Sequence, residues 1–209
     1  MLFEHGQKIL FIGDSITDTG RRLVTPPYGT GYVSLIRAFV DARYPELNLR
    51  WENRGIGGNT VRDLRDRWDE DVIREQPDWL SVKIGINDVW RTFDRNGEGS
   101  VPIDEYETTL RSLLQRATDE TPAKLIVAEP YHIEADTTHP MRAMMDEYGL
   151  IARKIAEEFG AIGIRTQEAF DRALASQPAS AWADDQIHPG LPGHAIIALA
   201  YLRAIGFEL

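Results

Sequence analysis

Two hydrophobic patterns alternate along the chain. Short apolar runs, typical of buried strands, are followed by longer segments in which apolar residues recur every three or four positions, as in a helix that packs one face against a core. The runs predict strands at 8–12, 47–51, 79–84, 125–128 and 161–164. The stripes predict helices at 32–43, from 61 to just before Pro77, and at 104–117, 141–159, 167–175 and 192–205, with a loop from 87 to about 102.

The alternation of strands and helices predicts the fold class. Strands that are separated by helices at this spacing form one parallel sheet with right-handed crossovers and helices on both faces. We therefore expect an α/β protein, a three-layer α/β/α sandwich of flavodoxin-like type with a five-stranded parallel sheet. A chain of 209 residues without repeats or linkers suits a single domain, 1–209, that buries about 70% of its unfolded surface.

Chemically distinctive residues follow each predicted strand. Ser15 follows the first strand, Gly58 the second, Asn87 the third and Tyr131 the fourth, and the segment from Asp185 to His188 lies beyond the fifth. The carboxyl ends of parallel strands lie along one edge of a sheet, where ligands bind. These residues are therefore expected to share one rim although they are remote in sequence.

The composition narrows the chemistry at this rim. The chain has no cysteine, which excludes disulfides, thiolate metal sites and a cysteine nucleophile and leaves serine as the attacking group. His132 and His139 lack metal-ligand spacing, so we expect no metal and no cofactor. His194, on the last predicted helix, is expected to be a surface or packing residue.

The net charge and the termini bear on partners and location. The formal net charge of −10 argues against binding to nucleic acid or to an anionic membrane. The N-terminus does not read as a signal peptide, and no long uncharged apolar run occurs, so we expect a soluble, cytoplasmic protein. The expected partner is a small-molecule ester, and a homo-oligomer is an open possibility.

A serine hydroxyl needs a base and an oxyanion site before it can attack an ester. Asp185 and His188 are three residues apart, so the carboxylate can accept the Nδ1 proton while Nε2 faces Ser15. The backbone N–H groups of Ser15 and Gly58 and the side-chain amide of Asn87 are candidate oxyanion donors. Each motif also has a purely structural interpretation, such as helix capping by Asp14 or Ser15, but their joint order favours a hydrolytic site.

Four sequence blocks carry a family resemblance. They are Gly13-Asp14-Ser15, the glycine Gly58 within residues 53–60, Gly85-Ile86-Asn87-Asp88, and Asp185-Gln186-Ile187-His188-Pro189. In these blocks the chain resembles the SGNH (GDSL-type) serine hydrolases. The resemblance implies Ser15 as nucleophile, His188 as base and then acid, Asp185 as the residue that orients His188, and an oxyanion hole formed by Ser15, Gly58 and Asn87.

A closer resemblance spans nearly the whole chain. Residues 13–18, 29–33, 58–64, 85–91 and 205–208 are similar to those of bacterial intracellular acetylxylan esterases, which implies deacetylation of xylo-oligosaccharides through an acyl-enzyme on Ser15. Those esterases carry a tryptophan immediately before the catalytic aspartate, whereas Asp184 stands here and the nearest tryptophan is Trp182. Asp185 is the expected partner of His188 because the three-residue step is intact.

The residues that contact substrate, and the substrate itself, are less well defined by the sequence. Candidate substrate-binding residues are Asp14, Trp90, Arg91 and Tyr131, although Trp90 could equally seal its loop against the sheet. The alternative functions are a short-chain carboxylesterase, a thioesterase, a lysophospholipase and a catalytically silent carbohydrate-binding protein. A nucleotide-binding module is disfavoured because the third glycine of its fingerprint falls at Thr60.

Overall fold

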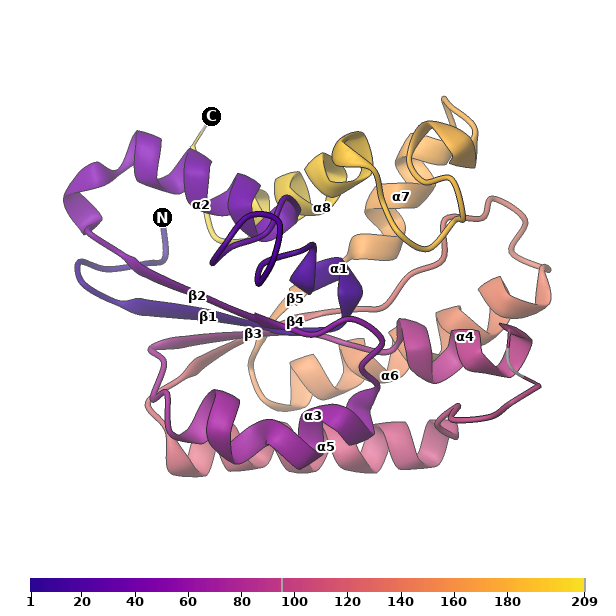
Figure 1. The fold of residues 1–209 in the computed structure, drawn as a ribbon, viewed down its shortest axis with the longest axis horizontal. Helices are drawn as coiled ribbons and strands as arrows, with labels where there is room; N and C mark the ends of the chain where they lie inside the picture. The colour runs from indigo at the N-terminus through magenta and orange to yellow at the C-terminus, as the bar shows by residue number, and fades with distance from the viewer. Residues whose placement is uncertain (95, 209) are drawn as a thin grey trace.

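The computed structural model describes residues 1–94 and 96–208. Residue 95 of the predicted loop and residue 209 of the predicted domain lie outside the described residues. The sheet has five parallel strands in the order β2-β1-β3-β4-β5 (Figure 1). The strands are β1 Lys8–Gly13, β2 Arg50–Gly55, β3 Trp79–Lys83, β4 Lys124–Ala128 and β5 Ile162–Ile164. The predicted fold class is confirmed.

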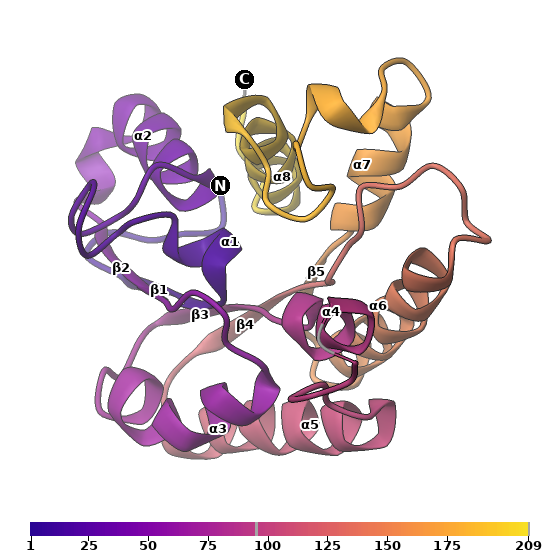
Figure 2. The same ribbon diagram turned by 45° about the vertical axis from the view of Figure 1, so that its right-hand side comes forward.

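Helices cover both faces of this sheet (Figures 1 and 2). One face carries α2 Tyr32–Arg43, α7 Thr166–Leu174 and α8 Leu191–Ala204. The other carries α3 Val61–Trp68, α5 Ile103–Glu120 and α6 Pro140–Glu158. Residues 9–12 of β1 are at most 1% exposed between these two layers. The continuous apolar run of β1 is therefore explained by burial on both faces.

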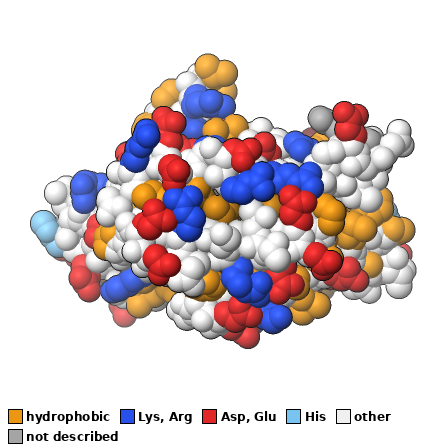
Figure 3. Space-filling view, turned by 90° about the horizontal axis from the view of Figure 1, so that it is seen from below, with side chains coloured by type: hydrophobic (Ala, Val, Ile, Leu, Met, Phe, Trp, Pro, Cys, Tyr) orange, Lys and Arg blue, Asp and Glu red, His pale blue; other side chains and the backbone are white. Residues whose placement is uncertain are grey.

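The surface seen from below, over α3 and α5, carries basic and acidic side chains interspersed with each other (Figure 3). Charged side chains of α3, α5 and α6 form ion pairs, including Arg62 with Glu105 and Arg111 with Glu107 and Glu158. A surface of mixed charge has no large field of a single sign that would attract a polyanion. No helix in the described part of the chain is long and apolar enough to cross a membrane.

Two of the predicted elements differ from the structure. The segment after Asn87 is not a loop throughout. The helix α4 spans Ile86–Asp94, and its residues Ile86 and Val89 are buried. The predicted strand 47–51 is displaced, since 45–47 form a short 3₁₀-helix and β2 begins at Arg50. In β2 buried residues alternate with half-exposed ones, as expected for a strand at the edge of the sheet.

The turn after β1 depends on Gly13. A Cβ atom at this position would overlap the Lys83 carbonyl oxygen on β3 and Thr17 Oγ1, because it would lie closer to both than van der Waals contact allows. Glycine therefore allows β1 to lie close to its neighbours at the point where the chain turns.

We predict that Gly13→Ala lowers the free energy of unfolding by about 1–3 kcal/mol, because the new methyl group forces the backbone apart. The matched control is Gly163→Ala in β5, where a Cβ would meet no atom within 4 Å and little change is expected. Urea unfolding monitored by circular dichroism measures both variants. Equal stability of the two variants would contradict this explanation for Gly13.

Candidate active site

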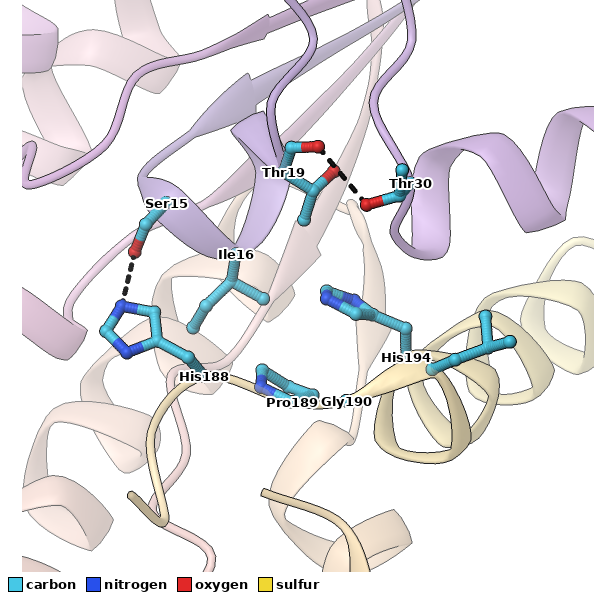
Figure 4. A pocket seen from close by; sticks show the side chains of 9 residues that line it. Ser15, Ile16, Thr19, Thr30, His188, Pro189, Gly190 and His194 are labelled. Carbon is cyan, nitrogen blue, oxygen red and sulfur yellow. Dashed lines mark hydrogen bonds between the residues drawn. The ribbon is translucent and has the colours of Figure 1, made fainter. Parts of the chain in front are cut away.

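A chain of two hydrogen bonds joins Ser15, His188 and Asp185. Ser15 Oγ lies 2.9 Å from Nε2 of His188 (Figure 4), and Nδ1 of His188 lies 2.6 Å from Asp185 Oδ2. Nδ1 of His188 donates this hydrogen bond to Asp185 and not to the neighbouring Asp184. In this arrangement the carboxylate accepts a hydrogen bond from Nδ1–H and so keeps the proton on Nδ1. Nε2 is then free to accept the hydroxyl proton of Ser15.

Asp14 places Ser15 at the start of a short helix, α1 (Ser15–Asp18). Asp14 is the N-cap residue, and its Oδ1 accepts a hydrogen bond from the Ile16 N–H at 2.9 Å. The structural interpretation of the motif, helix capping by Asp14, is therefore confirmed. Because Ser15 is the first residue of this helix, its N–H points away from the helix and donates to no described residue.

The segment that carries His188 folds around the carboxylate of Asp185. Asp185 Oδ1 accepts the N–H groups of Ile187 at 3.0 Å and His188 at 2.7 Å, and the intervening Gln186 has a positive φ of 63°. Burial raises the pKa of Asp185, but the hydrogen bonds from the His188 ring and from these two N–H groups hold it below its ordinary value. The carboxylate is therefore ionised at neutral pH.

The glycine-rich loop after β2 lies beside Ser15. A Cβ atom on Gly57 would be 3.9 Å from Cβ of Ser15, and Gly58 has a φ of +80°. The N–H of Gly58 donates to no described residue. Asn87, at the start of α4, is 3% exposed and donates from Nδ2 to the Asn59 carbonyl oxygen at 2.9 Å. The structure thus brings the three predicted oxyanion donors to the edge of the sheet where Ser15 lies.

Hydrogen bonds hold each residue of this loop. Asp18 Oδ2 accepts the Gly57 N–H at 3.1 Å, and Arg91 donates to the Gly58 carbonyl oxygen. Arg91 also donates to the carbonyl oxygen of Gly99. Its guanidinium therefore supports the loop, and the predicted contact of Arg91 with substrate stays a prediction.

Arg67 ties the loop to the strand that carries Ser15. Its Nε donates to Asn59 Oδ1 at 2.8 Å, Nη1 to the Arg54 carbonyl oxygen at 2.8 Å, and Nη2 to the Gly13 carbonyl oxygen at 3.0 Å. Nη1 also pairs with Asp71. This role was not predicted from the sequence, because Arg67 lies among charged residues that were assigned to the solvent-facing side of the helix.

The remaining predicted rim residues separate into two groups. Trp90 is half-buried and presents its ring edge-on to His188, with ring centroids 6.0 Å apart and planes at 83°. Asp14 and Tyr131 are fully buried, so the structure does not support the predicted contact of either with substrate. Tyr131 instead donates from its hydroxyl to the Ile187 carbonyl oxygen at 3.4 Å, beneath the segment that carries His188.

A cleft of about 490 Å³ opens beside the Ser15–His188 pair (Figure 4). Its walls include Ile16, Thr19, Thr30, Leu191 and His194. His194 was expected at the surface or in packing, and it is indeed mostly buried, but it also forms part of the cleft wall. Among the described residues, no cluster of three or more histidine, aspartate and glutamate side chains is arranged to hold a metal ion.

Asp88, next to Asn87, is fully buried at the base of the site. Its Oδ1 accepts the Val61 N–H at 3.0 Å, and Oδ2 has no hydrogen-bond partner. Burial raises the pKa of this carboxyl to about 7, although the hydrogen bond from Val61 opposes the shift. In an unfolded chain the pKa is about 3.9. Between these values the folded protein binds a proton that the unfolded chain releases.

We predict that this group makes the protein less stable as the pH rises from 5 to 8, since stability falls with pH wherever the folded state binds more protons. Asp88→Asn keeps the acceptor for Val61 and removes the titration. From pH 5 to pH 8 the unfolding free energy of Asp88→Asn should therefore rise relative to that of the wild type, because only the wild type loses this contribution. A difference in urea unfolding that is the same at both pH values would contradict this.

Comparison with known proteins agrees with this geometry. A model of the GDSL-like lipase/acylhydrolase family matches residues 11–196. An acetylxylan esterase from Geobacillus stearothermophilus is 48% identical over 210 residues, which are 97% of this chain and 95% of that protein. The crystal structure of Axe2, an acetylxylan esterase from the same organism, superposes with a TM-score of 0.96 at 47% identity and covers 100% of this chain and 98% of its own.

A second solved structure extends the likeness. LAE5, an alpha/beta hydrolase enzyme from the metagenome of Lake Arreo, has a TM-score of 0.95 and 44% identity, over 99% of this chain and 98% of its own. The family model and the esterase both match well over half of the chain. The chain therefore belongs to the GDSL-like lipase/acylhydrolase family.

Proposed function

We propose that the protein is a serine esterase that removes acetyl groups from acetylated xylo-oligosaccharides. The observation that carries the proposal is the pair of hydrogen bonds from Ser15 through His188 to Asp185. The acetyl specificity rests on the 48% identity with an acetylxylan esterase over nearly the full length of both chains.

In the first half of the reaction Ser15 Oγ attacks the acetyl carbonyl carbon while Nε2 of His188 takes its proton. Asp185, ionised because its pKa is lowered, stabilises the imidazolium that forms. The tetrahedral intermediate then expels the sugar alkoxide, which takes the proton from Nε2, and the acetyl group stays on Ser15. In the second half His188 takes a proton from a water molecule that attacks the acetyl carbonyl carbon. Acetate then leaves as its bond to Ser15 Oγ breaks and Nε2 returns the proton to that oxygen.

The N–H groups of Ser15 and Gly58 and the Asn87 amide are proposed to bind the oxyanion that forms in both halves. Donors stabilise such a charge best when they are held in position before the reaction. Hydrogen bonds of Asp18, Arg91 and Arg67 with residues 57–59 hold this part of the site in position. The Asn87 amide is fixed in turn by its bond to Asn59.

The relatives support these roles. Solved variants of the Geobacillus enzyme that are described as catalytic mutants replace one serine, one aspartate and one histidine with alanine. The same three residue types form the hydrogen-bonded chain described above for this protein.

The test of the proposed substrate is acetate release from acetylated xylo-oligosaccharides, compared with hydrolysis of aryl esters with acyl chains of two to twelve carbons and of acyl thioesters. We expect efficient acetate release and a steep fall for acyl chains longer than about four carbons, because a site for acetyl groups needs no acyl trough. Equal rates on long acyl chains would instead identify a general esterase or lysophospholipase.

We predict that Asn87→Ala lowers kcat by about 10²- to 10³-fold, the usual effect of removing one oxyanion donor. Ser15→Ala should abolish turnover with the fold intact, and Gln115→Ala, an exposed amide on α5, is the unaffected control. Steady-state kinetics on p-nitrophenyl acetate, with circular dichroism of each variant, measure the effects. Wild-type kcat in Asn87→Ala would exclude its side chain from the oxyanion hole.

Arg67→Lys tests the support of the loop. Lysine keeps the charge beside Asp71 but cannot bridge Gly13, Arg54 and Asn59 at once. We predict that kcat falls about 10- to 100-fold with little change in KM, because misplaced donors weaken binding of the transition state more than that of the substrate. Arg65→Lys, two residues away and exposed, should behave as wild type. A rise in KM at unchanged kcat would contradict a positioning role for Arg67.

A further inference from the structure

The proposed mechanism determines where the leaving alcohol must bind relative to Ser15 and His188. In the proposed mechanism Nε2 of His188 protonates the sugar oxygen as it departs, so that oxygen must lie within hydrogen-bond reach of both Ser15 Oγ and Nε2. The cleft in Figure 4 has both residues in its wall. A second hollow beside His188, formed by residues 180–184 and 188–190, does not include Ser15. The first cleft is therefore the one that meets the requirement.

The oxyanion side of the site lies outside this cleft. Gly58, Asn87 and Trp90 are not part of its wall, which continues from Ser15 and His188 to Thr19, Thr30 and His194. Its volume of about 490 Å³ lies within the range of roughly 300–1,000 Å³ that small-molecule sites occupy. An acetyl group, with two carbons, would fill little of it. The cleft thus has room for the larger part of the ester.

His194 presents a hydrogen-bond donor to this cleft. Nδ1 of its ring accepts the Tyr32 N–H at 3.3 Å, so the proton of the neutral ring is on Nε2. Burial, together with the charges of Lys83 and His188, lowers the pKa of His194 to about 4, which keeps the ring neutral at working pH. Nε2 has no hydrogen-bond partner among the described residues, yet it is not sealed from solvent.

Two threonines line the cleft with His194. Thr19 Oγ1 accepts the Gly31 N–H at 3.1 Å, so its own proton is free to donate, and Thr30 Oγ1 donates to the Thr19 carbonyl oxygen at 3.3 Å. Figure 4 shows the His194 ring reaching from α8 toward Ile16 and these threonines. Leu191 adds an apolar surface that is 64% exposed. A wall of a few polar groups on an apolar surface suits a sugar ring.

We propose that the sugar part of the ester binds in this cleft and that His194 Nε2–H donates a hydrogen bond to one of its oxygens. The inference rests on the proposed deacetylase function and adds to it the site and one contact of the leaving group. His194 is thereby a specificity residue: it recognises a hydroxylated alcohol and is not needed for a leaving group without hydroxyl groups.

Two substitutions at His194 separate this role from a structural one. His194→Asn places an amide oxygen near the position of Nδ1, which preserves the acceptor for Tyr32, and removes the outer donor. His194→Gln places an amide near the position of Nε2, which preserves the outer donor, and loses the inner acceptor. A structural role predicts that Gln is the more damaging variant, whereas a binding role predicts that Asn is.

The measured quantity is the ratio of kcat/KM on acetylated xylo-oligosaccharides to kcat/KM on p-nitrophenyl acetate. We expect His194→Asn to lower this ratio about five- to tenfold, the effect of one lost neutral hydrogen bond, and His194→Gln to change it about twofold or less. His5→Asn, at an exposed histidine near the N-terminus, is the control. An unchanged ratio in His194→Asn, or a larger fall in His194→Gln, would overturn the proposal.

A third variant tests whether the cleft holds the sugar or the acyl chain. Thr30→Phe narrows the cleft at its exposed rim. We expect it to lower the same ratio while the relative rates on p-nitrophenyl acetate and butyrate stay as in the wild type. Selective loss of butyrate hydrolysis would show that the acyl chain occupies the cleft and would refute the proposal. Failure of the wild-type protein to release acetate from the oligosaccharides would instead refute the proposed function itself.

Discussion

The hydrogen bond between Ser15 Oγ and His188 Nε2 joins two residues that are 173 positions apart in the chain. It can form only if the end of β1 and the segment before α8 reach the same edge of the sheet. The parallel topology places β1 inside the sheet, between the edge strand β2 and β3, and α8 packs against α2. Everything proposed about the chemistry of this protein depends on that meeting of the two ends of the chain.

Around this bond, hydrogen bonds between side chains and backbone groups hold the backbone of the site in position. The carbonyl oxygens of Gly13, Arg54 and Asn59 receive hydrogen bonds from side chains, and the N–H groups of Ile187 and His188 are held by one carboxylate. Backbone groups are identical in every residue type, so their arrangement is fixed by the few side chains that reach them. Arg67 reaches two separate segments of backbone at once, which couples β1, the strand that leads to Ser15, to the glycine-rich loop.

The fold and the chemical core of the site could be predicted from the sequence because they depend on periodic or local patterns. Buried strands and helical stripes predicted the sheet, and the three-residue step from Asp185 to His188 predicted the hydrogen bond between them, which the structure shows. The α4 helix was missed because Asn87 and Asp88, which resemble turn residues in sequence, are buried polar residues here. The position of β2 was missed because an edge strand does not need a continuous apolar run.

Two of the predicted rim residues do not lie at the rim, for a common reason. Asp14 and Tyr131 were placed there because they adjoin a motif, yet both are buried. The contacts of Arg67 and the place of His194 in the cleft wall were not predicted, because they depend on long-range contacts, with Gly13 and with Tyr32. Sequence spacing predicts contacts within one turn, whereas these contacts exist only once the helices are packed.

The most direct test of the central claim is covalent labelling with diethyl p-nitrophenyl phosphate, which forms a stable adduct with an activated serine. The account predicts that one diethylphosphoryl group is added per chain, that peptide mass spectrometry places it on Ser15, and that activity is lost in proportion to labelling. An adduct on another residue, or full activity after Ser15 has been labelled, would contradict the account.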